Sequence, residues 1–191
     1  MKVVAINGSQ RKDGNTAILI DLVFGELRNE GIECELIQLG GTSILGCTGC
    51  MGCAKSKNRQ CVNNKDIINE CIEKMVEADG ILLGSPTYIA NLSSGMKAFM
   101  ERTGLVTKVN GDLLRRKVGA AVVSARRCGA INVFNSLNEY FLVNEMIIPG
   151  SNYWNLGVGN KIGEVETDEE GIKTMKILGQ NMAWLLKKLK D

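Results

Sequence analysis

The chain has 191 residues, 45% of them apolar, and its 23 basic and 21 acidic side chains leave a net charge of +2. This length predicts one domain covering residues 1–191, and the balanced charge argues against nucleic acid or an anionic membrane surface as a partner. The sequence contains no histidine, which excludes Ser-His and Cys-His catalysis and imidazole-ligated metals. Because no apolar run could span a membrane and we expect no secretory signal, we predict a cytoplasmic protein whose seven cysteines bind metal or take part in redox chemistry.

Predicted strands and helices alternate along the chain. Short apolar runs predict strands at residues 2–7, 33–39, 80–84, 117–123 and 146–148. Helices are expected at residues 16–30, 65–78, in the segment that carries Met96 and Phe99, at 130–144 and at 169–189. This alternation is typical of an α/β protein with a parallel sheet covered on both faces. Five strands suit the flavodoxin-like doubly wound order 2-1-3-4-5, whose ligand crevice lies beyond the carboxyl ends of the strands.

A long cysteine-rich loop, residues 40–64, is inserted after the second predicted strand and exceeds the usual connection length. It contains four of the seven cysteines, spaced C-x2-C-x2-C-x7-C: Cys47, Cys50, Cys53 and Cys61. Structural zinc usually takes thiolates from separated C-x2-C pairs, whereas consecutive C-x2-C steps are typical of cubane iron–sulfur clusters. We therefore predict a [4Fe–4S] cluster on these cysteines, with zinc or metal-free thiols as the alternatives.

The other three cysteines carry weaker signals. Cys34 on a strand and Cys71 on the apolar face of a helix are expected to act as small hydrophobic residues. Cys128 follows the fourth strand near the expected crevice, where it is either incidental or a redox-active thiol.

Two loops at the ends of neighbouring strands have the character of a mononucleotide site. The first, residues 8–16, opens directly onto a helix and offers free backbone N–H groups, two hydroxyls and one guanidinium to an anion. It matches neither the dinucleotide fingerprint nor the P-loop, and an ordinary polar turn capped by Asn15 is the alternative. The second, residues 85–91, places a tyrosine and an isoleucine where they could flank a flat ring.

These segments resemble a known family. GSQRKDGNT resembles the GSxRxxGNT phosphate loop of NAD(P)H-dependent FMN reductases, and SPTYIANLSSGMKAFMER resembles the SPVYxGxxSxxxKxxxDR segment of the same superfamily. With the cysteine motif added, the whole chain is similar to the iron–sulfur flavoproteins of archaea and anaerobic bacteria. The resemblance implies FMN, one [4Fe–4S] cluster per chain and electron transfer between them.

The resemblance also implies which residues contact the flavin. The phosphate contacts fall on Ser9, Arg11, Asn15 and Thr16. The ring contacts fall on Pro86, Thr87, Tyr88, Ile89 and Asn91, with Ser124 and Arg126 in the third flavin loop. That third loop, residues 123–130, departs from the family by being shorter and poorer in glycine, which puts its ring contacts and any nicotinamide site in question.

The predicted function is that of an oxidoreductase that passes electrons between the cluster and FMN, from ferredoxin to a small-molecule acceptor. The alternatives are an NAD(P)H-dependent FMN or quinone reductase with a structural zinc clip, and a non-catalytic redox sensor. We also predict a homodimer or a dimer of dimers, because the cluster loop and the ring need not be close within one chain. Residues 40–64, with Tyr153 and Trp154, are expected at the interface; packing under the final helix is the alternative for the two aromatic residues.

Overall fold

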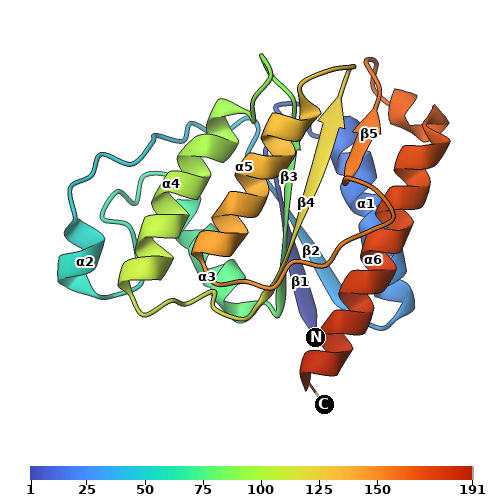
Figure 1. The fold of residues 1–191 in the computed structure, drawn as a ribbon. Coiled ribbons are helices and arrows are strands. Elements are labelled where there is room, and N and C mark those ends of the chain that lie inside the picture. Colours follow the sequence, from blue (N-terminus) through green and yellow to red (C-terminus); the bar gives the residue numbers. More distant parts are fainter. Residues whose placement is uncertain (191) are drawn as a thin grey trace.

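Five parallel strands form the centre of the protein in the computed structural model, which describes residues 1–190 (Figure 1). The strands are β1 (Lys2–Asn7), β2 (Glu33–Gln38), β3 (Gly80–Pro86), β4 (Val118–Ala125) and β5 (Leu156–Val158). They lie in the order β2-β1-β3-β4-β5, as predicted. The order reverses between β1 and β3, so the loops after these strands diverge to opposite faces and open a crevice between them.

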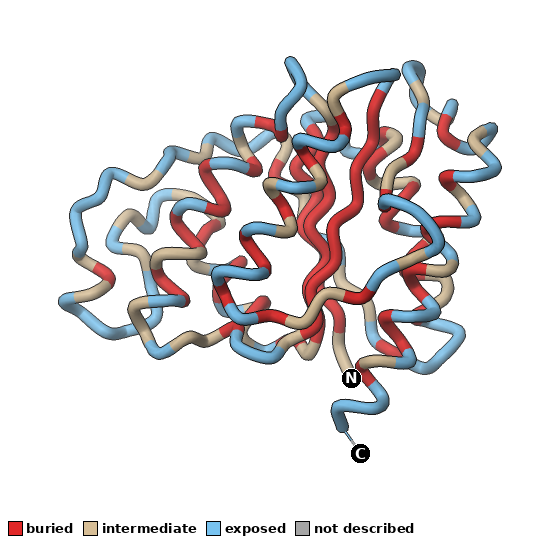
Figure 2. The backbone as a smooth tube through the Cα atoms, viewed as in Figure 1, coloured by how far each residue is buried: buried red, intermediate tan, exposed pale blue. Residues whose placement is uncertain are grey.

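Helices cover both faces of the sheet (Figure 1). One face carries α1 (Asn15–Asn29) and α6 (Glu169–Lys190), and the other carries α3 (Ile68–Glu77), α4 (Ser94–Val109) and α5 (Ala130–Val143). Alternate residues of each central strand enter the two cores, with Val3 and Ala5 on one side and Val4 and Ile6 on the other. The tube in Figure 2 is accordingly buried along the whole of β3 and β4.

The fifth strand is not where the sequence predicted it. Residues 146–148 contribute only an isolated bridge between Ile147 and Val118, at the amino end of β4. Pro149 follows and has no backbone N–H to continue the ladder. The chain then leaves the sheet and returns as β5, which pairs with residues 123–125 at the carboxyl end of β4. The apolar run at 146–148 was therefore a wrong assignment, and the correct strand is half exposed.

The cysteine-rich loop leaves the sheet after β2 and runs outward past α4 (Figure 1). It contains one short helix that the sequence did not predict, α2 (Gly52–Ser56), flanked by Met51 and Lys57 in the left-handed backbone region. Lys57 Nζ donates to the carbonyl oxygen of Val109 over 2.7 Å, which attaches the far end of the loop to the end of α4.

Candidate functional site

A pocket of about 160 Å³ opens at the carboxyl ends of β1, β3 and β4. It is lined by nine of the eleven residues predicted to bind the flavin: Ser9, Arg11, Asn15, Thr16, Pro86, Thr87, Tyr88, Ser124 and Arg126. Ala125, Gly159 and Asn160 also line it and were not predicted. The signal for Gly159 and Asn160, a Gly-Asn pair directly after a strand, was hidden because the fifth strand was placed about ten residues too early.

Hydrogen bonds fix the loop after β1 from within. Ser9 Oγ accepts from the backbone N–H of Arg11 over 3.1 Å, and Asn7 Oδ1 accepts from the N–H of Ser9 over 3.0 Å. The Gln38 side chain of β2 donates to the carbonyl oxygen of Ser9 over 2.5 Å. These bonds hold the loop in one conformation, and it presents the positive end of α1 to the pocket.

The Asn15 side chain forms hydrogen bonds to a distant segment of the chain. Its amide nitrogen donates to the carbonyl oxygens of Gly159 and Lys161 over 3.1 and 2.9 Å, and its Oδ1 accepts from the N–H of Gly163 over 2.9 Å. Both amide hydrogens are used, and a phosphate only accepts hydrogen bonds. The Asn15 side chain therefore anchors residues 159–163 to the start of α1, and its contact with the phosphate stays a prediction.

The Thr87 hydroxyl in this pocket is buried and has no hydrogen-bond partner among the described residues. Beside it, the hydroxyls of Thr16 and Ser124 bond to each other over 2.8 Å. A buried hydroxyl without a partner costs free energy, and a polar ligand atom in the pocket would satisfy it. This orphan hydroxyl fits the carbonyl- and nitrogen-rich edge of a flavin.

Two of the predicted ring contacts do not line the pocket. Tyr88 and Asn91 exchange backbone hydrogen bonds of 2.8 and 3.0 Å, which folds the segment into a tight turn. Ile89 at the tip of the turn is 99% exposed and does not line the pocket. Asn91 faces instead a groove of about 800 Å³ between α4 and α5, which begins at Tyr88 and reaches Glu101.

The four predicted cluster ligands, Cys47, Cys50, Cys53 and Cys61, line one small pocket of about 30 Å³ beside α4. Left-handed backbone at Gly49 and Met51 curls the chain around it. The N–H of Gly49 points at the sulfur of Cys47 over 3.4 Å. Backbone N–H groups directed at cysteine sulfurs are suited to thiolates that carry the negative charge of a cluster.

The thiols differ in their electrostatic surroundings. The N–H of Gly52, with the Thr48 hydroxyl, lowers the pKa of Cys50. Burial raises the pKa of Cys53. Among residues 1–190, no three cysteine or carboxylate side chains are placed to hold one metal ion. Each cysteine of a cubane binds a different iron, so the four ligands of a cubane are spread more widely than those of a single zinc ion.

The remaining cysteines lie outside both pockets. Cys71 is fully buried in the core, where burial raises its pKa to about 12, and Cys34 is partly buried on β2. Cys128 is exposed after β4. Both expectations for Cys34 and Cys71 as small hydrophobic residues agree with these positions.

Sequence reasoning missed one charged residue at the cysteine pocket, Arg102 of α4. It lines the pocket together with all four cysteines, and it is buried. Its signal was available, since it follows Phe99 by three residues and precedes Val106 by four on the apolar face of a helix. A charge at such a position is rarely buried unless it is paired.

Comparisons with known proteins agree with this arrangement. Residues 1–161 match the family model of NADPH-dependent FMN reductases. The chain is 35% identical to an iron–sulfur flavoprotein of Methanocaldococcus jannaschii, with 100% of both chains covered. It is 37% identical over 149 residues to an iron–sulfur flavoprotein of Archaeoglobus fulgidus, covering 77% of this chain and 71% of the relative.

Solved structures show the same fold. RosB with the bound intermediate 8-demethyl-8-formylriboflavin-5'-phosphate is similar with a TM-score of 0.77 at 21% identity, covering 100% of this chain and 80% of RosB. A flavodoxin from the Archaea is similar with a TM-score of 0.62 at 18% identity, covering 98% of this chain and 99% of the flavodoxin. Fold and pocket together define the class, a flavodoxin-like flavin oxidoreductase.

Within this class, the chain belongs to the iron–sulfur flavoproteins of the NADPH-dependent FMN reductase family. This membership confirms the predicted fold and oxidoreductase class, and at the level of the family it confirms FMN and an iron–sulfur cluster as the cofactors. None of the helices in residues 1–190 is long and apolar enough to cross a membrane.

Proposed function

We propose that this protein transfers electrons between a [4Fe–4S] cluster held by Cys47, Cys50, Cys53 and Cys61 and an FMN held at the carboxyl ends of the strands. The observation that carries the proposal is the convergence of the four cysteines on one pocket, apart from the pocket that the flavin loops line. FMN accepts one or two electrons, whereas a cubane cluster passes them singly.

The proposed flavin site divides into a closed and an open part. Loop residues 9–16 and Arg11 receive the single terminal phosphate, through backbone N–H groups and one charge-assisted hydrogen bond. The recess of about 160 Å³ is smaller than the roughly 300–1,000 Å³ of enclosed ligand pockets, which supports an isoalloxazine ring that lies partly open to solvent beside Tyr88. The Thr87 hydroxyl then donates to, or accepts from, the polar edge of the ring.

We further propose a homodimer or a dimer of dimers in which each cluster faces the flavin of a neighbouring chain. The cysteine loop projects outward beyond α4 (Figure 1). The flavin pocket lies over the ends of β1, β3 and β4. Electron transfer slows steeply with distance, and closed homo-oligomers are the common arrangement in which a projecting loop meets a partner. Tyr153 and Trp154 are about half exposed, which suits an interface better than packing under α6.

The proposed electron donor is a ferredoxin and the proposed acceptor is a small molecule. Cys50 is exposed at the outer side of its pocket, so a small redox protein can approach the cluster there. The groove between α4 and α5, which begins at Tyr88, gives a small acceptor access to the flavin side.

Anaerobic reconstitution of the full chain tests the proposal. About four iron and four sulfide per chain, with broad visible absorption beyond the flavin bands, supports the [4Fe–4S] assignment. One zinc per chain without sulfide contradicts it and leaves an FMN reductase with a metal clip. Reduction by ferredoxin in a stopped-flow instrument, followed by reoxidation with a small acceptor at a catalytic rate, separates the enzyme from a redox sensor. Sedimentation of the loaded protein tests the assembly, which a fully active monomer would contradict.

A further inference from the structure

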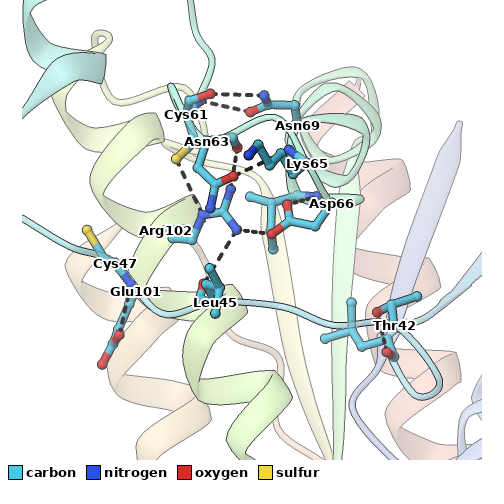
Figure 3. Close-up of polar contacts among 12 residues, drawn as sticks. Thr42, Leu45, Cys47, Cys61, Asn63, Lys65, Asp66, Asn69, Glu101 and Arg102 are labelled. Carbon is cyan, nitrogen blue, oxygen red and sulfur yellow. Dashed lines mark hydrogen bonds and ion pairs between the residues drawn. The ribbon is translucent and has the colours of Figure 1, made fainter. Parts of the chain in front are cut away.

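Arg102 and Asp66 form a buried ion pair under the cysteine loop (Figure 3). The side chain of Arg102 is 1% exposed and that of Asp66 is 5% exposed, whereas every other arginine of the chain is exposed. Removing two charges from water costs several kcal/mol per ion, so such a pair persists only when further hydrogen bonds and a fixed geometry compensate the cost. The contacts of this guanidinium are therefore informative.

The Arg102 guanidinium connects separate points of the loop. Its Nη1 bonds to Asp66 and lies 3.4 Å from the carbonyl oxygen of Leu45, and its Nη2 donates to the carbonyl oxygen of Asn63 over 2.6 Å. Leu45 precedes the first cluster cysteine, while Asn63 and Asp66 follow the last, so one side chain joins the two ends of the motif to α4 (Figure 3). Only the planar fork of arginine can make these contacts at once.

The remaining donor of the same side chain points at a proposed cluster ligand. Arg102 Nε donates to Cys61 Sγ over 3.3 Å. The backbone of Cys61 is fixed separately, since its N–H donates to Asn69 Oδ1 over 2.8 Å and its carbonyl oxygen accepts from Asn69 Nδ2 over 3.0 Å. The sulfur of Cys61 is therefore held between a fixed backbone and a fixed cation.

We propose that Arg102 is the positioning residue of the cluster, that it closes the cysteine loop by joining its two ends, and that its N–H bond to the Cys61 sulfur raises the reduction potential. The inference rests on the proposed function, because it assumes that the four cysteines hold the cluster. Reduction adds negative charge to the cluster and its sulfurs, and an N–H donor or a nearby cation stabilises that added charge. Asp66 keeps the guanidinium oriented and compensates its burial.

The experiment compares anaerobically reconstituted full-length variants. Arg102→Gln removes the charge and the fork, and Arg102→Lys keeps the charge alone. The double variant Arg102→Gln with Asp66→Asn avoids an unpaired buried carboxylate and serves if the single variant does not fold. Arg28→Gln, which changes an exposed arginine of α1, is the matched control. The measurements are iron release to a chelator, the midpoint potential of the cluster and the FMN content.

We expect the double variant to release iron about 10–100-fold faster than Arg28→Gln, the range typical for outer-shell partners of metal ligands. Its cluster potential becomes more negative, and Arg102→Lys recovers the potential in part but not the slow release. FMN content stays unchanged, because Arg102 does not line the flavin pocket. A double variant with wild-type release and wild-type potential overturns the inference.

Hydrogen exchange on the metal-free protein separates this inference from the proposed function. If the wild-type chain takes up no iron and sulfide, the proposed function fails. Hydrogen exchange at residues 45–66 then decides alone whether Arg102 acts as a clamp, that is, whether it holds the two ends of the cysteine loop together. Faster exchange in the double variant than in Arg28→Gln then supports the clamp, and equal exchange overturns it. A cluster that loads in the wild type with unchanged behaviour in the double variant contradicts the inference while leaving the proposed function intact.

Discussion

The flavin pocket and the cysteine loop are built in opposite ways. The flavin pocket uses the ends of three adjacent strands, and its loops are fixed by short hydrogen bonds among Asn7, Ser9 and Gln38 and between Thr16 and Ser124. The cysteine loop lies outside the sheet with five helical residues of its own and depends on α4 for its shape. A ligand site on sheet ends is set by the fold, whereas a site on a long excursion needs a dedicated clamp.

This difference implies that the two sites can be lost separately. The pocket residues of one do not line the other, and the groove that begins at Tyr88 and ends at Glu101 is the feature that lies between them. A variant that changes one site should therefore leave the cofactor of the other site in place.

The largest effect is expected from Cys50→Ala. Cys50 is exposed, so its loss leaves the core intact while one proposed cluster ligand disappears. We expect iron and sulfide after reconstitution to fall at least about tenfold, with FMN content unchanged. Metal and flavin analysis measures both, and Cys128→Ala, also exposed, is the control. Loss of both cofactors in Cys50→Ala would show that the two sites are not independent.

Arg11→Ala is expected to act on the flavin alone. The variant loses one charge-assisted hydrogen bond to the phosphate, worth about 1.5–3 kcal/mol, so FMN should bind about 10–100-fold more weakly. Fluorescence titration of the apoprotein measures the affinity, and Lys12→Ala, a charge removal in the same loop outside the pocket, is the reference. Iron content should not change. Equal FMN affinity in both variants would remove Arg11 from the phosphate site.

Thr87→Val should increase the stability of the flavin-free protein and decrease its affinity for FMN. The substitution removes the buried hydroxyl that has no partner among the described residues, so the flavin-free protein should be more stable by about 1 kcal/mol. The same change removes a hydrogen bond to the ring and should weaken FMN by about 2–10-fold. Urea unfolding and flavin titration test the pair of effects. A variant that binds FMN as well as the wild type would mean that the hydroxyl does not face the ring.

The smallest effect is expected from Glu164→Gln. The backbone N–H groups of Lys161 and Asn160 hold the Glu164 carboxylate and lower its pKa below the usual value near 4.5. The carboxylate therefore orders residues 159–163 above about pH 4.5, and this contribution is lost as the pH falls through the lowered pKa. We expect Glu164→Gln to weaken FMN about twofold at pH 7. Hydrogen exchange at residues 159–163 of this variant should match that of the acidified wild type. If exchange in both is the same as in the wild type at pH 7, Glu164 does not order this segment.

The sheet could be predicted because each buried strand is an apolar run bounded by polar loops. The fifth strand failed for a physical reason: β5 covers only the carboxyl end of β4, so it is short and half exposed, and the apolar run at Met146 looked more like a strand. The helix predicted at residues 65–78 corresponds to α3, and its predicted start was three residues too early. Asp66 accepts from the N–H of Ile68 over 3.2 Å, and α3 begins only there.

Pocket residues could be predicted where they belong to a sequence motif. They could not be predicted where contacts with distant segments of the chain determine their position. Ser9, Arg11 and Thr87 occupy the positions that the motif implies. The bond of the Asn15 amide to a segment 144 residues away in the chain could not be predicted from the motif. Arg102 ends a motif and lies on the apolar face of a helix, but its partners could not be predicted because they lie in a loop that precedes it by about 40 residues.

The anchoring of Asn15 to residues 159–163 has a consequence for biosynthesis. Arg102 is the last residue of the clamp in the chain, whereas residues 159–163, to which Asn15 bonds, follow about 60 residues later. At about 5–20 residues per second, the ribosome adds that stretch in about 3–12 s. In a chain that leaves the ribosome, the residues that hold the cysteine loop are therefore made before those that complete the flavin pocket.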